Sequence, residues 1–93
     1  MNKHVGSHLD DFLEEEDLLA EAEAAATKRV IAWQIEKMMR SEGLRKSEMA
    51  RRMGTSRSAL DRLLDPSNPS VTLLTLERAA RALGKKVRVE LAA

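Results

Sequence analysis

Four polar side chains with base-reading chemistry lie close together in the stretch RSALDRLL: Arg57, Ser58, Asp61 and Arg62. The stretch has the spacing of a helix over 57–64, which puts these side chains on one face and Leu60, Leu63 and Leu64 on the other. The planar guanidinium of arginine can bond both acceptors on the major-groove edge of guanine. The polar face can therefore read a base pair if the rest of the chain holds this helix with that face free.

A shorter helix and a turn come directly before this segment. Over roughly 48–53, Met49, Ala50 and Met53 share one helical face. Gly54 should end this helix, because glycine accepts the left-handed backbone that follows a helix end. Ser56 is suited to cap the next helix, since its hydroxyl can accept a backbone N–H. Helix, glycine turn and helix is the arrangement of the helix-turn-helix unit.

A helical hairpin that merely packs, with a solvated polar face, is the alternative interpretation. Three features favour the reading unit over it. Ala50, Gly54 and the inner leucines fall in register together, and the outer face carries short and forked polar groups instead of a Glu/Lys mixture. A further amphipathic helix also follows at a suitable distance.

From about Val30 to Gly84 the chain resembles the Xre/Cro-type helix-turn-helix family, which has the lambda-repressor-like fold. The family's core positions match Ala50, Gly54, Leu60 and Leu63. The resemblance implies base reading by Ser56, Arg57, Ser58, Asp61 and Arg62, and a phosphate contact by Arg45 or Lys46. Glutamine is more frequent in the family at the position of Arg57, so we expect a preference for guanine instead of adenine.

The expected fold is all-α: a lambda-repressor-like bundle of about five helices with a short C-terminal β-strand. We divide the chain into a disordered N-terminus (1–8), an acidic amphipathic helical arm (9–27), the helix-turn-helix domain (28–84) and the strand (85–93). Thr72 should cap the last helix, and Ser47 the first helix of the reading unit. Val87, Val89 and Leu91 alternate with charged residues, which is typical of a half-buried strand. Such a strand must pair with its twin in a dimer or with a partner's sheet edge, or else fray; we favour pairing with another chain.

Composition limits the function classes. The 93 residues suffice for one small domain, and the absence of cysteine excludes disulfides and thiolate metal sites. No apolar run approaches a membrane span or the core of a signal peptide, so we expect a cytoplasmic protein with no membrane contact. We find no catalytic constellation and expect neither an enzyme nor a cofactor. His4 and His8 could share a metal only if the N-terminus were ordered.

The net charge of +1 hides a strong asymmetry. Residues 9–27 hold eight acidic side chains and no basic one, whereas residues 28–93 hold fifteen basic and seven acidic ones, a net charge of +8. A basic domain attracts polyphosphate. The acidic arm, in which Phe12 and Leu13 share a face with Leu9, could cover its own core, dock on a basic partner or shield the basic surface.

Two apolar stripes run along the helix expected over 28–42. Ile31, Ile35 and Met38 or Met39 should pack on the reading unit. Val30 and Trp33, with Ala26 and Leu19 before them, form a second stripe that either packs against the N-terminal arm or is an interface. For Trp33 itself, a core position is slightly favoured over an interface. The turn cluster at 65–70 lies near the DNA backbone in the family, so Ser67, Asn68 and Ser70 are candidate phosphate contacts, with ordinary loop residues as the alternative.

These features predict a sequence-specific regulator that binds double-stranded DNA as a homodimer. The arm adds a looser resemblance to antitoxins of type II toxin–antitoxin modules of the host-inhibition-of-growth kind. That resemblance implies neutralisation of a basic RelE/ParE-like toxin. The rival interpretation is a protein-interaction module on a helix-turn-helix scaffold. Candidate partner or dimer contacts are Phe12, Leu13, Trp33, Val87, Val89 and Leu91.

Overall fold

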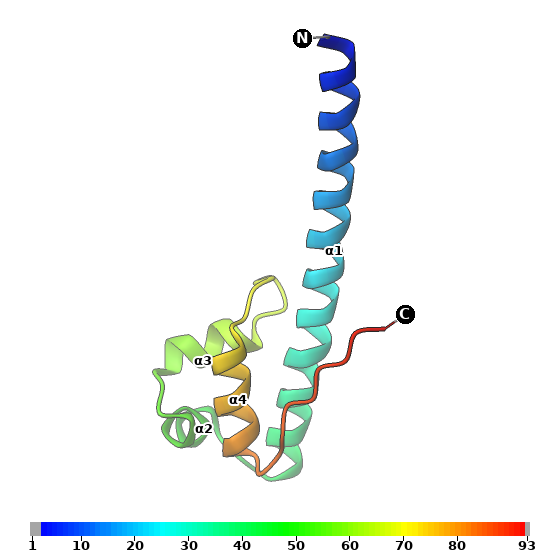
Figure 1. Cartoon of the computed structure of the whole chain (residues 1–93). Coiled ribbons are helices and arrows are strands. Elements are labelled where there is room, and N and C mark those ends of the chain that lie inside the picture. Colours follow the sequence, from blue (N-terminus) through cyan, green and yellow to red (C-terminus); the bar gives the residue numbers. More distant parts are fainter. Residues whose placement is uncertain (1–2, 93) are drawn as a thin grey trace.

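A computed structural model describes residues 3–92 of the chain, with side chains from residue 16 onward. In this part the chain forms four helices: α1 (Lys3–Ser41), α2 (Lys46–Met53), α3 (Arg57–Leu64) and α4 (Leu73–Ala82). Figure 1 shows α2, α3, α4 and the C-terminal tail gathered against the lower part of α1, whose upper part extends away from them. No helix in the described range is long and apolar enough to cross a membrane.

The described residues form four helices where about five were expected, because the arm at 9–27 and the helix expected over 28–42 are one continuous helix, α1. α1 also includes residues 3–8, where we expected no regular structure. The sequence has neither glycine nor proline between Ser7 and Glu42, and residues 18–27 are rich in strong helix formers. Nothing in the chain therefore interrupts the hydrogen-bond ladder before Gly43.

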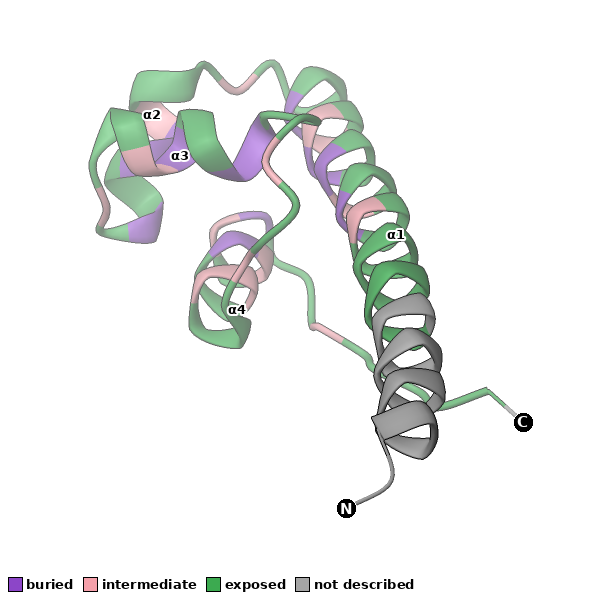
Figure 2. Cartoon of the chain, turned by 90° about the horizontal axis from the view of Figure 1, so that it is seen from above, coloured by how far each residue is buried: buried purple, intermediate pink, exposed green. Residues whose placement is uncertain are grey.

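The core lies where the inner face of α1 meets the three short helices. Each helix contributes buried apolar side chains: Ala32, Ile35 and Met39 from α1; Met49, Ala50 and Met53 from α2; Leu60, Leu63 and Leu64 from α3; Ala79 and Leu83 from α4 and its end. Figure 2 shows these buried positions facing one another. The faces expected for the reading unit are thus confirmed. At the start of α4, Leu73 is exposed, although it continues the apolar pattern of that helix.

Local capping sets most of the helix ends. α2 ends at Gly54, which has a φ of +67°, and Thr55 N–H donates to the Ala50 carbonyl at 3.0 Å. Ser56 and Thr72 each accept a backbone N–H three residues on, at 3.1 Å, which confirms both caps. The expected cap at Ser47 is wrong: α2 begins at Lys46, and Arg45 stands at its cap position without a side-chain bond.

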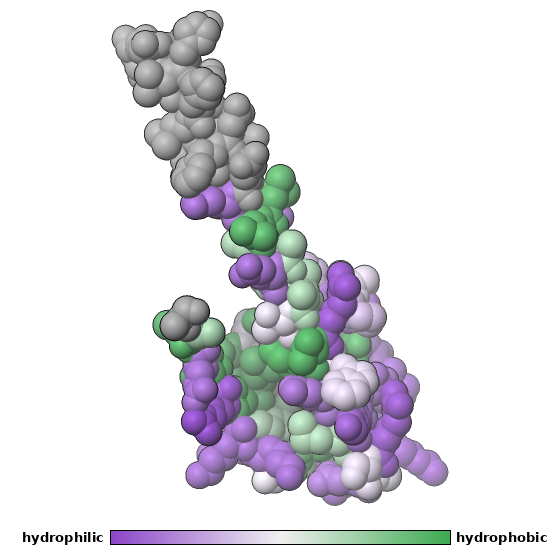
Figure 3. Space-filling model, turned by 90° about the vertical axis from the view of Figure 1, so that its right-hand side faces the viewer, coloured by the Kyte–Doolittle hydropathy of each residue, from purple (hydrophilic) through white to green (hydrophobic). Residues whose placement is uncertain are grey.

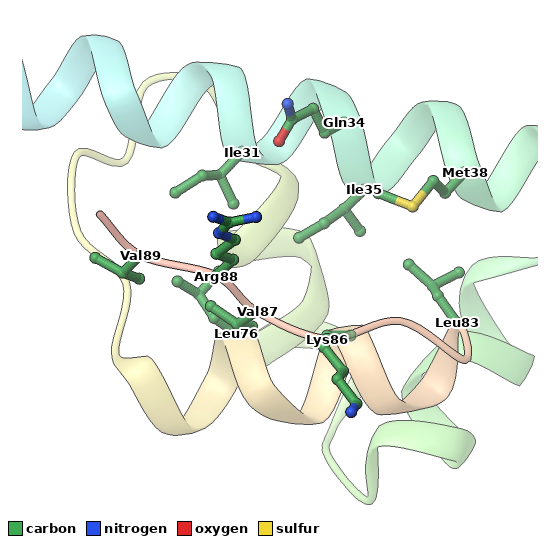
Figure 4. Close-up of a pocket in the computed structure, with 11 residues that line it drawn as sticks. Ile31, Gln34, Ile35, Met38, Leu76, Leu83, Lys86, Val87, Arg88 and Val89 are labelled. Carbon is green, nitrogen blue, oxygen red and sulfur yellow. The ribbon is translucent and has the colours of Figure 1, made fainter. Parts of the chain in front are cut away.

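The C-terminal tail forms no strand within the described residues 85–92. It runs beside α1 and closes one side of a hollow of about 320 Å³ between α1 and α4 (Figure 4). Val87 is half-buried there, near Ile31 and Leu76, while Val89 and Leu91 stay exposed. Since the described chain offers no strand to pair with, the alternating pattern buries a single valine against helices instead of joining a sheet.

Replacing Leu60 by alanine should lower the free energy of unfolding by about 2–5 kcal/mol, because its side chain is fully buried and the substitution leaves a cavity. The matched variant is Leu74→Ala, whose leucine is 60% exposed on α4 and should change stability by less than about 0.5 kcal/mol. Urea denaturation measures both. Equal losses in the two variants would contradict the packing described.

Candidate nucleic-acid interface

The outer face of α3 is open to solvent. Arg57, Ser58, Asp61 and Arg62 are all exposed, while the leucines on the opposite face anchor the helix in the core. Ser56 is partly engaged: its hydroxyl accepts the Ala59 N–H and lies 3.2 Å from the Ser58 hydroxyl. Four of the five residues expected to read bases therefore lie together on this helix, and the fifth caps its start.

An ion pair ties the beginning of α2 to the middle of α3. Lys46 Nζ lies 3.3 Å from Asp61 Oδ1, and both side chains are about half exposed. The pair places a candidate phosphate contact next to the reading face. It also partly offsets the negative charge of Asp61, which would otherwise repel the DNA backbone.

A basic hollow of about 410 Å³ opens between the end of α1, the loop after it and the start of α3. Its cationic lining residues are Arg40, Arg45, Lys46 and Arg57. Sequence reasoning singled out three of these but missed Arg40, which pairs with Glu36 at 3.6 Å. Arg40 could have been noticed as the cation in the last turn before the loop. Such a cluster has the charge and the donors that a backbone phosphate needs.

Residues 34–87 match the model of the Cro/C1-type HTH DNA-binding domain. The chain belongs to this family. The matched range contains the end of α1, all of α2, α3 and α4, and the first residues of the tail. DNA is thus a partner of the protein, and transcription regulation is the function class that the domain supports. No curated protein and no solved structure showed significant similarity to the chain.

The loop after α3 in this Cro/C1-type domain binds largely to itself. Asn68 Nδ2 donates to the Arg62 carbonyl at 3.2 Å, and its Oδ1 accepts the Ser70 N–H at 3.3 Å. The Ser67 hydroxyl and N–H donate to Asp65 Oδ1, which lowers the pKa of that carboxyl, and the charge of Lys28 lowers it further. These bonds favour ordinary loop roles over phosphate contacts for Ser67, Asn68 and Ser70.

A buried lysine that sequence reasoning missed holds the end of α3. Lys28 is only 2% exposed, and its Nζ donates to the carbonyls of Arg62 at 2.9 Å and Asp65 at 2.7 Å. A cation is favourable at this end of α3, where unpaired carbonyls concentrate negative potential. Burial lowers the pKa of Lys28, and the Asp65 carboxylate partly opposes that shift. The signal in the sequence is spacing, since Lys28 continues the inner stripe of Ala32 and Ile35.

The residues expected at a partner or dimer interface fall into three groups. Trp33 is 58% exposed, which overturns the core alternative, and Lys37 Nζ lies 4.9 Å from the centre of its ring. Val89 and Leu91 are exposed on the tail, whereas Val87 is half-buried. Phe12 and Leu13, like His4 and His8, lie outside the described side chains. Trp33 and the tail therefore stay available to another molecule.

Replacing Lys28 by methionine should cost about 1–3 kcal/mol of stability, because two carbonyls at the end of α3 lose their donor. The cost should depend on pH. Burial lowers the pKa of Lys28 in the folded protein. In the pH window between that lowered pKa and the ordinary lysine pKa of about 10.4, the unfolded chain therefore holds more of this proton than the folded chain does. Wild type should therefore gain stability relative to Lys28→Met as pH rises through that window.

Chemical denaturation at several pH values measures this difference. The control is Lys85→Met, whose lysine is exposed after α4 and should show no such difference. Parallel pH profiles for wild type and Lys28→Met would contradict the buried cap.

Proposed function

We propose that this Cro/C1-type protein represses transcription by binding a specific DNA sequence as a homodimer. The observation that supports it most strongly is the exposed outer face of α3, which presents Arg57 and Arg62 beside the basic hollow. The arginines have the geometry for base edges, and the hollow has the charge for the backbone.

In this proposal α3 enters the major groove with its first turn leading. Arg57 lies in that turn and contacts the edge of a guanine, while Arg62 reads a neighbouring pair. Arg45 and Lys46 hold adjacent phosphates, and Arg40 adds a third cation. A single domain of this size buries too little surface for tight specific binding. A second copy therefore binds another half-site of the DNA one duplex turn away.

The second, finer proposal is that the protein is the antitoxin of a type II module and represses its own operon. A specific observation favours a protein partner: α1 carries its acidic half away from the body, and residues 16–27 are exposed apart from half-buried Ala25. Such a segment complements a basic RelE/ParE-like toxin electrostatically. The same observation speaks against the arm as a cover for its own core.

A protein-interaction module without specific DNA binding is the rival function, since fold alone does not guarantee activity. We propose binding, not catalysis, as the activity in either case. The two functions differ in what the outer face of α3 does, and that face can be altered without touching the core.

The double variant Arg57→Ala with Arg62→Ala should lose at least about 30-fold in affinity for the protein's own upstream DNA, because each base contact contributes about 1–3 kcal/mol. Fluorescence anisotropy measures the affinity, and circular dichroism should show an unchanged fold because both side chains are exposed. The matched control is Arg78→Ala with Arg81→Ala, two exposed arginines on α4. If both double variants bind alike, the reading face is assigned wrongly.

The antitoxin proposal predicts a growth phenotype. A small basic protein encoded beside this gene should arrest growth when expressed alone, and co-expression of this chain should restore growth. A triple variant, Glu16→Gln with Glu21→Gln and Glu23→Gln, should rescue less well because three negative charges are removed from the exposed arm. Glu77→Gln, on α4, should rescue fully. Equal rescue by all forms would argue against the arm as the binding element.

A further inference from the structure

α1 is apolar on two opposite faces. Its inner face enters the core through Ala32, Ile35 and Met39. The opposite face carries a row that we call the outer stripe: Leu19, Ala22, Ala26, Val30 and Trp33. All five are exposed, and the three large ones keep more than half of their surface open, at 61% for Leu19, 53% for Val30 and 58% for Trp33. Figure 3, which views this side of the molecule, shows patches of apolar surface along the helix with hydrophilic side chains between them.

The spacing of the outer stripe is that of a helix-pairing seam. Its members follow one another at intervals of three, four, four and three residues, which keeps them on one helical face and is symmetric about Ala26, although it is not the strict heptad of a coiled coil. A helix that is only solvated on this side has no need for such a row. Exposed apolar rows bordered by charged residues mark interaction surfaces.

The charges of α1 determine which pairing is possible. Its first half, residues 9–27, holds eight acidic side chains and no basic one. Residues 28–41 hold one acidic side chain and four basic ones, of which Arg29, Lys37 and Arg40 are exposed and Lys28 is buried. A parallel pair would set the two acidic halves against each other. An antiparallel pair sets each acidic half against the basic half of the other copy, so the helix is complementary to itself in that orientation alone.

We propose that two copies of this chain pair antiparallel through the outer stripe, with the two-fold axis at Ala26. This register places Leu19 opposite Trp33 and Ala22 opposite Val30, because each pair is symmetric about position 26. The small alanines allow close approach at the centre, and large side chains fill the ends. Lys37, which lies over the Trp33 ring, then lies near position 15 of the other copy, beside the exposed Glu16.

The arrangement is compatible with DNA reading. The short helices pack on the inner face of α1, so the two bodies lie outside the helix pair. Figure 2 shows α2 and α3 on one side of the body and α4 on the other. A two-fold axis perpendicular to both copies of α1 keeps the two α3 helices on the same side of the dimer, as adjacent half-sites require. The interface thus deepens the proposed homodimer and rests on that part of the proposed function.

Sedimentation equilibrium of the full chain without DNA tests the surface. Wild type should dimerise, and Val30→Glu should raise the dissociation constant at least about 100-fold, because each dimer would bury two unpaired charges. The matched control is Leu74→Glu. Leu74 lies outside the outer stripe and is about as exposed as Val30, so this variant should leave the dissociation constant unchanged. A monomer at all concentrations, or a dimer that tolerates Val30→Glu, overturns the proposal.

Disulfide trapping tests the orientation, since the natural chain has no cysteine. Ala22→Cys mixed with Val30→Cys should give a disulfide-linked dimer on mild oxidation, while each variant alone should give little. Self-linking of Ala22→Cys would instead indicate a parallel pair and overturn the proposal. Neither experiment involves DNA, so failure here is distinguishable from failure of the reading face.

Discussion

The two helices of the reading unit are too short to be stable alone, and this constraint governs the rest of the structure. α2 and α3 have eight residues each, whereas isolated helices need about 12–15 residues to be even marginally stable in water. They persist because Met49, Leu60 and Leu63 are buried in a core shared with α1 and α4. Using one face of α3 for this core leaves the opposite face free for DNA.

Basic side chains reinforce the same short helices at their ends. Lys28 binds one carbonyl in the last turn of α3 and one just after it, and Arg52 Nη1 donates to the Ala82 carbonyl at the end of α4, at 3.3 Å. Each bond joins elements far apart in the sequence and places a cation where unpaired carbonyls gather. Lys28 lies in α1 before the range matched by the family model. The end of α3 therefore depends on a residue of α1 that directly follows the acidic arm.

Local patterns predicted the reading unit well. The limits of α3, the glycine that ends α2 and the caps at Ser56 and Thr72 all follow from short-range chemistry. Features that depend on distant partners were missed or predicted wrongly. A lysine looks solvent-exposed until its carbonyl partners about 35 residues away are known, as at Lys28. The alternation at Val87 and Val89 specifies a strand only where another strand is available.

The basic short helices and the acidic first half of α1 give the protein two surfaces of opposite charge. The central claim is that the basic surface binds a specific DNA sequence. The most direct test is fluorescence anisotropy of the wild-type protein on its own upstream DNA and on a scrambled duplex, at several salt concentrations. The account predicts selective binding that weakens steeply as salt rises but keeps its preference for the upstream sequence. Equal, weak binding to both duplexes would contradict it, because the outer face of α3 would then read no sequence.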